Sequence, residues 1–166
     1  MGPSSVPCGR AGANSIKGRF NKMGAVNIVK NIKLVHPSCM TLVKIGSFYT
    51  VYSKDAYIVS YLFKYKITEK ENIPTCSFPV SSISKIENIL EKNKINYIVV
   101  DKRANYEEEQ KVINKQENNY DKVFERAQKS VNITLRIQNI YNVLIKNKEN
   151  PQIIEKLEKI EKAIIN

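Results

Sequence analysis

The fold of this chain depends most on Val43-Lys44-Ile45-Gly46-Ser47-Phe48-Tyr49, an apolar, β-prone run that reaches a glycine and then places two aromatic residues together. The pattern begins at Thr41, and its nearly continuous apolar character predicts a strand over residues 41–48 that is buried on both faces. A flat aromatic ring at a strand end, in a basic neighbourhood, is typical of a residue that stacks on a nucleobase. The alternative is that Phe48 and Tyr49 fill the core of an α/β domain.

Helical spacing of apolar residues appears on both sides of this run. It predicts a short helix over residues 24–34, which should stop before His36-Pro37, because proline disfavours helical backbone in the preceding residue. A second helix is expected over residues 54–63. Its packing stripe would consist of Tyr57, Ile58, Tyr61 and Leu62.

Further along, extended and helical patterns alternate. A charged hairpin turn at 66–71 leads into residues 73–79, whose two prolines favour an edge strand. The next helix has capping-box spacing between Ser84 and Glu87, and residues 97–101 have the strongest strand pattern. This order predicts an α/β (α+β) fold, with helices flanking a mixed β-sheet.

The character of the sequence changes after Asp101. Residues 102–119 are charged and weakly patterned, which indicates a boundary or an exposed helix. A long helix is expected over residues 120–145, followed by a last helix with Asn150 as N-cap and Pro151 as its first residue. The apolar stripe of that helix comprises Ile153, Leu157, Ile160 and Ile164. We expect an antiparallel helical hairpin that packs on the α/β domain or on another subunit.

Net charge is distributed unevenly over three predicted parts: a flexible basic leader (1–22), an α/β domain (23–104) and a helical extension (105–166). The chain carries +11 in total, and its first acidic residue is Asp55. Eight unopposed basic residues precede it: Arg10, Lys17, Arg19, Lys22, Lys30, Lys33, Lys44 and Lys54. Such polarity favours a polyanionic partner, because neutralised phosphates release counterions. A solvated basic tail is the alternative.

Several classes of function find little support in the sequence. The cysteines Cys8, Cys39 and Cys76 are widely spaced and form no zinc motif with His36, so we expect no metal and no cofactor. The carboxylates of Glu107-Glu108-Glu109 are candidates for a general acid/base site, but they have the pattern of a solvated helix face. We therefore expect that the protein is not an enzyme. No apolar run approaches the roughly 18 residues of a membrane span, and we expect a cytoplasmic protein.

Five blocks together carry a resemblance to a known family: His36-Pro37, Gly46-Ser47-Phe48-Tyr49, Asp55-Ala56, residues 73–79 and Tyr97-Ile98-Val99-Val100. Their order and spacing resemble the amino-terminal mismatch-recognition domain of the MutS family of DNA mismatch-repair proteins. The resemblance covers about residues 35–101 and implies a mixed sheet with surrounding helices. It also implies that Phe48 matches the aromatic wedge that stacks into a mismatched duplex from the minor groove.

The chain also departs from that pattern. Thr50 stands where the family has the mismatch-reading glutamate, which puts base discrimination in doubt, and Ser47 and Ser77 replace an aspartate and a glycine. Nothing matches the phosphate-binding motif G-x-x-x-x-G-K-[ST], so this chain has no ATPase motif of that kind.

Two non-enzymatic functions follow. The first is a DNA-binding module for duplex DNA, mismatched or bent. Its contacts would be Phe48, Tyr49, Lys44, Lys54, Lys30 and Lys33. The second is a protein-interaction or assembly module that keeps the fold, has lost mismatch recognition with the glutamate, and forms a homodimer or binds a protein partner through its carboxy-terminal helices.

Overall fold

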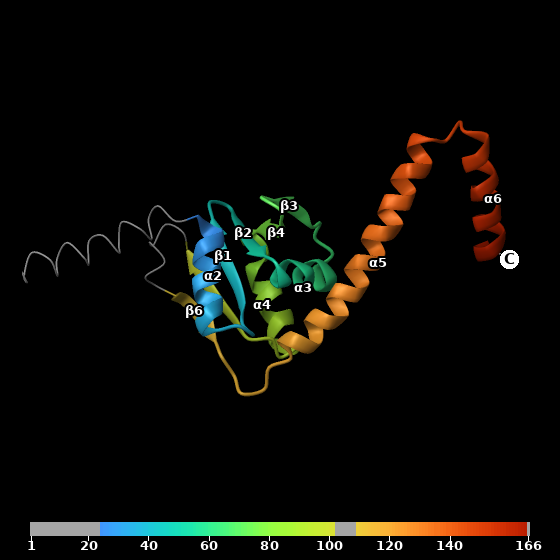
Figure 1. The fold of residues 1–166 in the computed structure, drawn as a ribbon. Helices are drawn as coiled ribbons and strands as arrows, with labels where there is room; N and C mark the ends of the chain where they lie inside the picture. Colours follow the sequence, from blue (N-terminus) through green and yellow to red (C-terminus); the bar gives the residue numbers. More distant parts are fainter. Residues whose placement is uncertain (1–23, 102–108, 166) are drawn as a thin grey trace, which may run out of the picture. The chain divides into compact units, whose positions relative to one another are not determined.

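The computed structural model describes residues 24–101 and 109–165, and the predicted leader lies outside these ranges. Figure 1 shows the helices and strands. They are α2 (Ala25–Val35), β1 (Met40–Ile45), β2 (Phe48–Tyr52), α3 (Lys54–Phe63), β3 (Thr68–Lys70), β4 (Ile73–Pro79), the 3-10 turn η2 (Val80–Ser82), α4 (Ile83–Lys92), β5 (Tyr97–Asp101), β6 (Glu109–Ile113), α5 (Tyr120–Lys146) and α6 (Pro151–Ile165). The chain divides into two compact units, the first ending at Gln128 and the second beginning at Lys129.

The first unit is built on a six-stranded mixed sheet with the order β3-β4-β2-β1-β5-β6. Strands β1 and β5 are parallel, and the other neighbouring pairs are antiparallel. The connection between β1 and β5 must therefore cross over, and it contains α3 and α4. This confirms the predicted α+β fold with a mixed sheet and flanking helices.

Apolar side chains are buried on both faces of the sheet. Helices α3, α4 and the start of α5 cover one face, where Leu42, Tyr49 and Phe78 join the larger core. Helix α2 covers the other face over a smaller core that includes Val43 and Tyr52 (Figure 1). Because successive residues of a strand point to opposite faces, β1 and β2 supply both cores, as the continuous apolar run predicts.

The expected single strand over residues 41–48 is wrong in one respect. Strand β1 ends at Ile45, and the chain turns through Gly46 and Ser47 into the antiparallel strand β2, which begins at Phe48. Gly46 has a φ of 62°, a left-handed conformation that glycine adopts without a steric penalty. Tight two-residue hairpins need such a residue, so Gly46 marks a turn within the apolar run.

Several other predictions agree with the structure. Helix α3 and strand β5 have the expected bounds, and α2 differs from expectation by one residue at each end. The segment 66–71, expected as a hairpin turn, contains strand β3, which pairs with β4, so the turn itself lies at Glu71 and Asn72. The buried residues of α3 are Asp55, Ala56, Ile58 and Val59, whereas the predicted stripe residues Tyr57, Tyr61 and Leu62 are only half-buried. The helix therefore buries its smaller side chains most completely, and its tyrosines pack at the margin of the core.

Two details of the next segment are corrected. Strand β4 lies between β3 and β2, so it is not the edge strand; its prolines fit because they lie at its ends, opposite Glu69 and Phe48. Helix α4 begins at Ile83 after η2, with Ser82 as N-cap and no side-chain cap. Ser84 lies inside the helix, so the predicted capping box is not formed.

Residues 109–113 form strand β6, which pairs with β5. An exposed helix was one interpretation of 102–119, and it is wrong for this strand. Lysines and glutamates are tolerated at a sheet edge, where charge discourages further pairing. The sheet thus continues beyond residue 104, and the predicted domain boundary between residues 104 and 105 stays a prediction.

The second unit contains the rest of α5 and helix α6. Asn150 caps α6 as predicted, since its Oδ1 accepts the Gln152 backbone N–H at 3.0 Å and Pro151 is the first helical residue. The predicted stripe of α6 is not buried: Leu157 is 38% exposed and Ile164 is 76% exposed. The α5 residues Ile137, Ile140 and Val143 are exposed as well.

Candidate nucleic-acid interface

Phe48 lies at the tip of the β1–β2 hairpin and projects into solvent. Its side chain is 52% exposed, and the neighbouring Gly46 and Ser47 are exposed too. Residues at the end of β4 and the start of η2 support the turn. The Val80 backbone N–H donates to the Ser47 carbonyl at 3.0 Å, and Phe48 pairs with Pro79 across the sheet. The hairpin therefore presents an apolar ring from a supported backbone.

Tyr49 occupies the opposite face of β2. Its ring stacks on Phe78, with ring centroids 5.6 Å apart and planes 24° apart. Burial, followed by the negative charges of Glu87 and Asp101, raises the pKa of the Tyr49 phenol above its usual value. The predicted DNA contact at Tyr49 thus lies in the core, where the ring can support the hairpin.

Thr50 returns to the Phe48 side of β2, but it is buried. Its hydroxyl lies 2.9 Å from the Ser77 hydroxyl on β4, and the two strands pair directly at these residues. Thr50 and Ser77 therefore satisfy each other across the sheet.

The predicted lysines fall into two groups. Lys44 is near the hairpin, opposite Tyr49 in the strand register, and its Nζ lies 3.7 Å from Asp101 Oδ2. Lys30, Lys33 and Lys54 gather around the other end of β2, beside Tyr52 and Ser53. The four residue steps from Phe48 to Tyr52 span about 13 Å at about 3.3 Å per residue. The structure does not bring all the predicted site residues together.

Lys33 is bound within the protein. Its Nζ donates to Asp55 Oδ1 at 2.8 Å and to the Tyr120 hydroxyl at 3.1 Å, and it also contacts the Cys39 carbonyl. Lys54 Nζ lies 5.0 Å from the centre of the Phe124 ring. Lys30 is exposed, and neither Lys30 nor Lys54 has an ion-pair partner among residues 24–101 and 112–165.

Comparison of the sequence with protein-family models identifies the family of this chain. The family model described as MutS domain I matches residues 23–132, which is most of the chain. The chain belongs to the MutS domain I family. No curated protein matches it.

Membership of the MutS domain I family makes this chain a DNA-recognition domain of the MutS type, and that family domain is a non-catalytic one. The match extends beyond the region of resemblance, through β6 and into α5. The family assignment made from the five sequence blocks is thereby confirmed.

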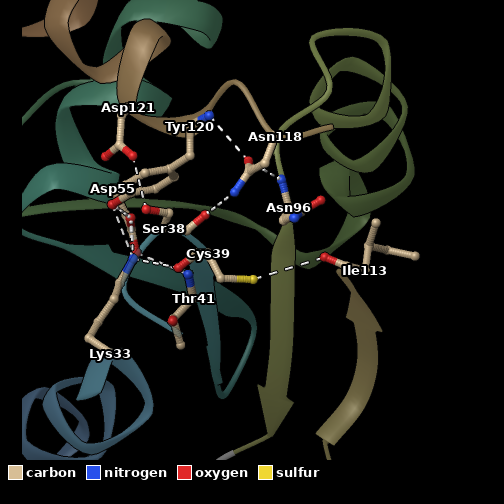
Figure 2. A network of polar contacts seen from close by, with 10 residues as sticks. All are labelled: Lys33, Ser38, Cys39, Thr41, Asp55, Asn96, Ile113, Asn118, Tyr120 and Asp121. Atoms are coloured by element: carbon tan, nitrogen blue, oxygen red, sulfur yellow. Dashed lines mark hydrogen bonds and ion pairs between the residues drawn. The ribbon is translucent and has the colours of Figure 1, made fainter. Parts of the chain in front are cut away.

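Sequence reasoning missed the polar network that joins the start of α5 to the sheet. Asp55 is fully buried; its Oδ1 accepts the Tyr120 hydroxyl at 2.6 Å, and its Oδ2 accepts the Thr41 backbone N–H at 2.9 Å (Figure 2). Burial, and then the charge of Asp55, raises the pKa of Tyr120. The sequence signal for this network was an acidic residue, Asp55, among the apolar residues of a helix. Its partner Tyr120 is too far away in the sequence for residue spacing to indicate the pairing.

A second part of this network fixes the segment before α5. Asn118 Nδ2 donates to the Ser38 carbonyl at 2.6 Å, and its Oδ1 accepts the backbone N–H groups of Asn96 and Tyr120, each at 3.2 Å. Figure 2 shows Asn118 between these groups. The carboxylate and amide groups of the network are thus engaged in hydrogen bonds within the protein. Among the residues described, no cluster of metal-ligating side chains occurs. Within the same ranges, no helix is long and apolar enough to cross a membrane.

Proposed function

We propose that this MutS domain I binds duplex DNA without catalysis and uses Phe48 as a wedge. The observation that carries the proposal is the exposed Phe48 ring at the tip of a supported hairpin. Exposing a large apolar side chain to water is unfavourable, and insertion between base steps would remove it from water. A wedge also needs a firm base, which the Tyr49–Phe78 stack supplies on the opposite face.

Recognition would depend on duplex deformability more than on reading a base. The family's glutamate would accept a hydrogen bond from a mispaired base, but Thr50 is buried and its hydroxyl is engaged with Ser77. Base steps that unstack easily lower the cost of inserting a ring. We therefore infer a preference for kinkable or mismatched duplexes with little discrimination among mismatches.

Phosphate contacts beside the wedge would come first from Lys44. It lies on the hairpin itself, and its 3.7 Å ion pair with Asp101 is long enough to exchange for a phosphate. Lys33 is a poorer candidate because Asp55 already neutralises it. Lys30 and Lys54 would reach a duplex only if it extended along β2.

Salt-dependent binding tests this function. Two to four phosphate contacts predict a slope of log affinity against log salt of about −2 to −4. Binding of a mismatched duplex can be followed by fluorescence anisotropy between about 50 and 200 mM salt, the range over which phosphate contacts weaken steeply. No binding at the lowest salt with about 100 µM protein, the weak end of non-specific affinity, would exclude the DNA-binding function.

A protein-interaction function is the second candidate, and the exposed apolar residues of the second unit favour it. Ile137, Ile140, Leu157 and Ile164 are all exposed within the chain. Monomeric proteins rarely leave such apolar surface uncovered. A homodimer or a protein partner held by α5 and α6 would cover it.

A further inference from the structure

A pocket of about 510 Å³ opens at the end of β2 that is remote from Phe48. It is lined from α2, from the β2–α3 junction and from the start of α5, all within the first unit. Its lining residues include Val29, Lys30, Leu34, Tyr52, Ser53 and Lys54. A volume of this size is typical of sites for small organic ligands.

The walls of the pocket are apolar. Val29 and Tyr52 are buried core residues that turn one side towards it, while Leu34 at its rim is 82% exposed. An exposed leucine beside an apolar hollow extends the surface that a ligand could cover. The walls therefore fit the hydrocarbon body of a ligand.

The charge at the pocket is positive. Lys30, Lys33 and Lys54 line it, and no acidic residue in the described part of the chain does, although Asp55 neutralises Lys33. Lys30 and Lys54 keep their charge uncompensated among the described residues, and Phe124 holds the Lys54 amine in place. A carboxylate, sulfonate or phosphate group would complement these two amines.

The backbone beside Lys54 adds an independent observation. Ser53 has a φ of 55° and a ψ of −125°, which a residue with a side chain rarely adopts. Its N–H donates to the Pro74 carbonyl at 2.8 Å and its carbonyl accepts the Ala56 N–H at 3.1 Å, so the surrounding structure maintains this conformation. Backbone strain of this kind is concentrated at binding sites.

We propose that this pocket binds a small organic anion with an apolar body, whose charged group lies at Lys30 and Lys54. A nucleobase fits less well: among the described residues, the polar side chains of the lining other than the lysines carry only hydroxyl groups, and the Tyr120 hydroxyl is already bonded to Asp55. The edge of a base would stay largely unpaired there. The amino-terminal residues 1–23 contain four basic residues and no acidic one, so they do not complement the charge of the pocket.

A tryptophan placed at the pocket tests the proposal with the full chain. The protein contains no tryptophan, so Leu34→Trp adds a single reporter at an exposed rim position. We expect sodium decanoate to shift its emission to the blue and to saturate below about 1 mM. Inorganic phosphate alone should produce no shift, because it lacks an apolar body. A chain with Ile164→Trp, an exposed residue of α6, is the matched reporter and should not respond.

Charge reversal then separates the pocket from general electrostatic attraction. In the Leu34→Trp background, Lys30→Glu with Lys54→Glu should weaken decanoate binding at least tenfold. The same change in charge at the exposed α4 residues Lys85 and Lys92 should leave binding within twofold. Circular dichroism checks folding, and Lys30→Glu alone serves if the double variant is unfolded.

Four results would overturn the proposal: no saturable shift, equal weakening by both charge reversals, an equal response at Ile164→Trp, or displacement of decanoate by a short DNA duplex. Displacement by the duplex would assign Lys30 and Lys54 to DNA instead. The wedge function is independent of this outcome, because Phe48→Ala should leave decanoate binding unchanged.

Discussion

Phe48 and Tyr49 are adjacent in the sequence and lie on opposite faces of β2, one 52% exposed and the other 6% exposed. Successive side chains of a strand point to opposite faces, so the two aromatic residues have different surroundings: one is exposed and the other packs in the core. Phe48 is available to a ligand, whereas Tyr49 belongs to the core with Phe78.

Tyr49→Ala should cost about 3 to 5 kcal/mol of unfolding free energy, because it removes a buried ring from the core. Tyr49→Phe keeps the stack on Phe78 and should cost less than about 1.5 kcal/mol. Urea denaturation measures both. Equal, small losses for the two variants would mean that Tyr49 does not support the hairpin.

Asp55→Ala should cost about 3 to 5 kcal/mol, because it leaves Lys33 and the Tyr120 hydroxyl without their buried partner. Ser38→Ala is a matched control, since it removes the exposed 3.0 Å bond to Asp121 and should cost less than about 1 kcal/mol. Thermal unfolding of the two variants compares them. A loss for Asp55→Ala no larger than that for Ser38→Ala would contradict a structural role for the network.

Alkaline pH should destabilise the fold in part through Cys76. Burial raises the pKa of its thiol from 9.0 to about 11, so the folded state keeps a proton that the unfolded state releases. The stabilisation is complete below pH 9 and is lost as pH rises through about 11. Cys76→Ala should therefore be less stable than the parent at pH 7, with a difference that narrows by pH 10.5. A difference that stays constant or widens in urea titrations at the two pH values would show that the thiol is not shielded.

Leu157→Asp tests the second candidate function. Burial of the stripe would have made this change cost several kcal/mol, but Leu157 is exposed, so the monomer should unfold at nearly the same temperature. If α5 and α6 hold a second copy, the parent chain should sediment as a dimer and Leu157→Asp as a monomer. Lys156→Asp, also exposed on α6, makes the net charge more negative than Leu157→Asp does, so it controls for the effect of charge and should stay dimeric. A monomeric parent would exclude the homodimer.

The elements with one dominant signal could be predicted from the sequence. Strand β5 has a β-branched centre, and α6 has an asparagine and a proline at its start, so local preferences and the final structure agree. The apolar run predicts one strand that continues through Gly46, although a two-residue hairpin also places glycine at such a position. Strand β6 is charged and weakly patterned, and its pairing with β5 is a tertiary contact that periodicity does not report.

The candidate site was predictable to a similar degree. Phe48 could be proposed as a stacking residue because an aromatic residue at a strand end can be exposed. Thr50 could be proposed as the degenerate mismatch-reading position because the family resemblance marks it. The lysines could not be sorted by sequence, since Lys33 differs from Lys30 only in facing Asp55, which is 22 residues away in the chain. Their positive charge was evident, but their partners depend on the fold.

Thr50→Glu provides a gain-of-function test of the same surface. A glutamate at this position replaces the hydroxyl pair with Ser77 and would regain the carboxylate found in the family. Affinity for a mismatched duplex relative to a paired one should rise by about 1 kcal/mol, the worth of one such hydrogen bond. An unchanged ratio in a folded variant would indicate that position 50 does not reach the minor groove.

The affinity of Phe48→Ala for a mismatched duplex tests the central claim most directly, provided that the unfolding free energy is measured on the same sample. An exposed wedge predicts a loss of about 1 to 3 kcal/mol of binding free energy and a change in stability within about 0.5 kcal/mol. Phe48→Tyr, which keeps a ring able to stack, should retain most of the affinity. A folded Phe48→Ala chain that binds the duplex as tightly as the parent would contradict the account.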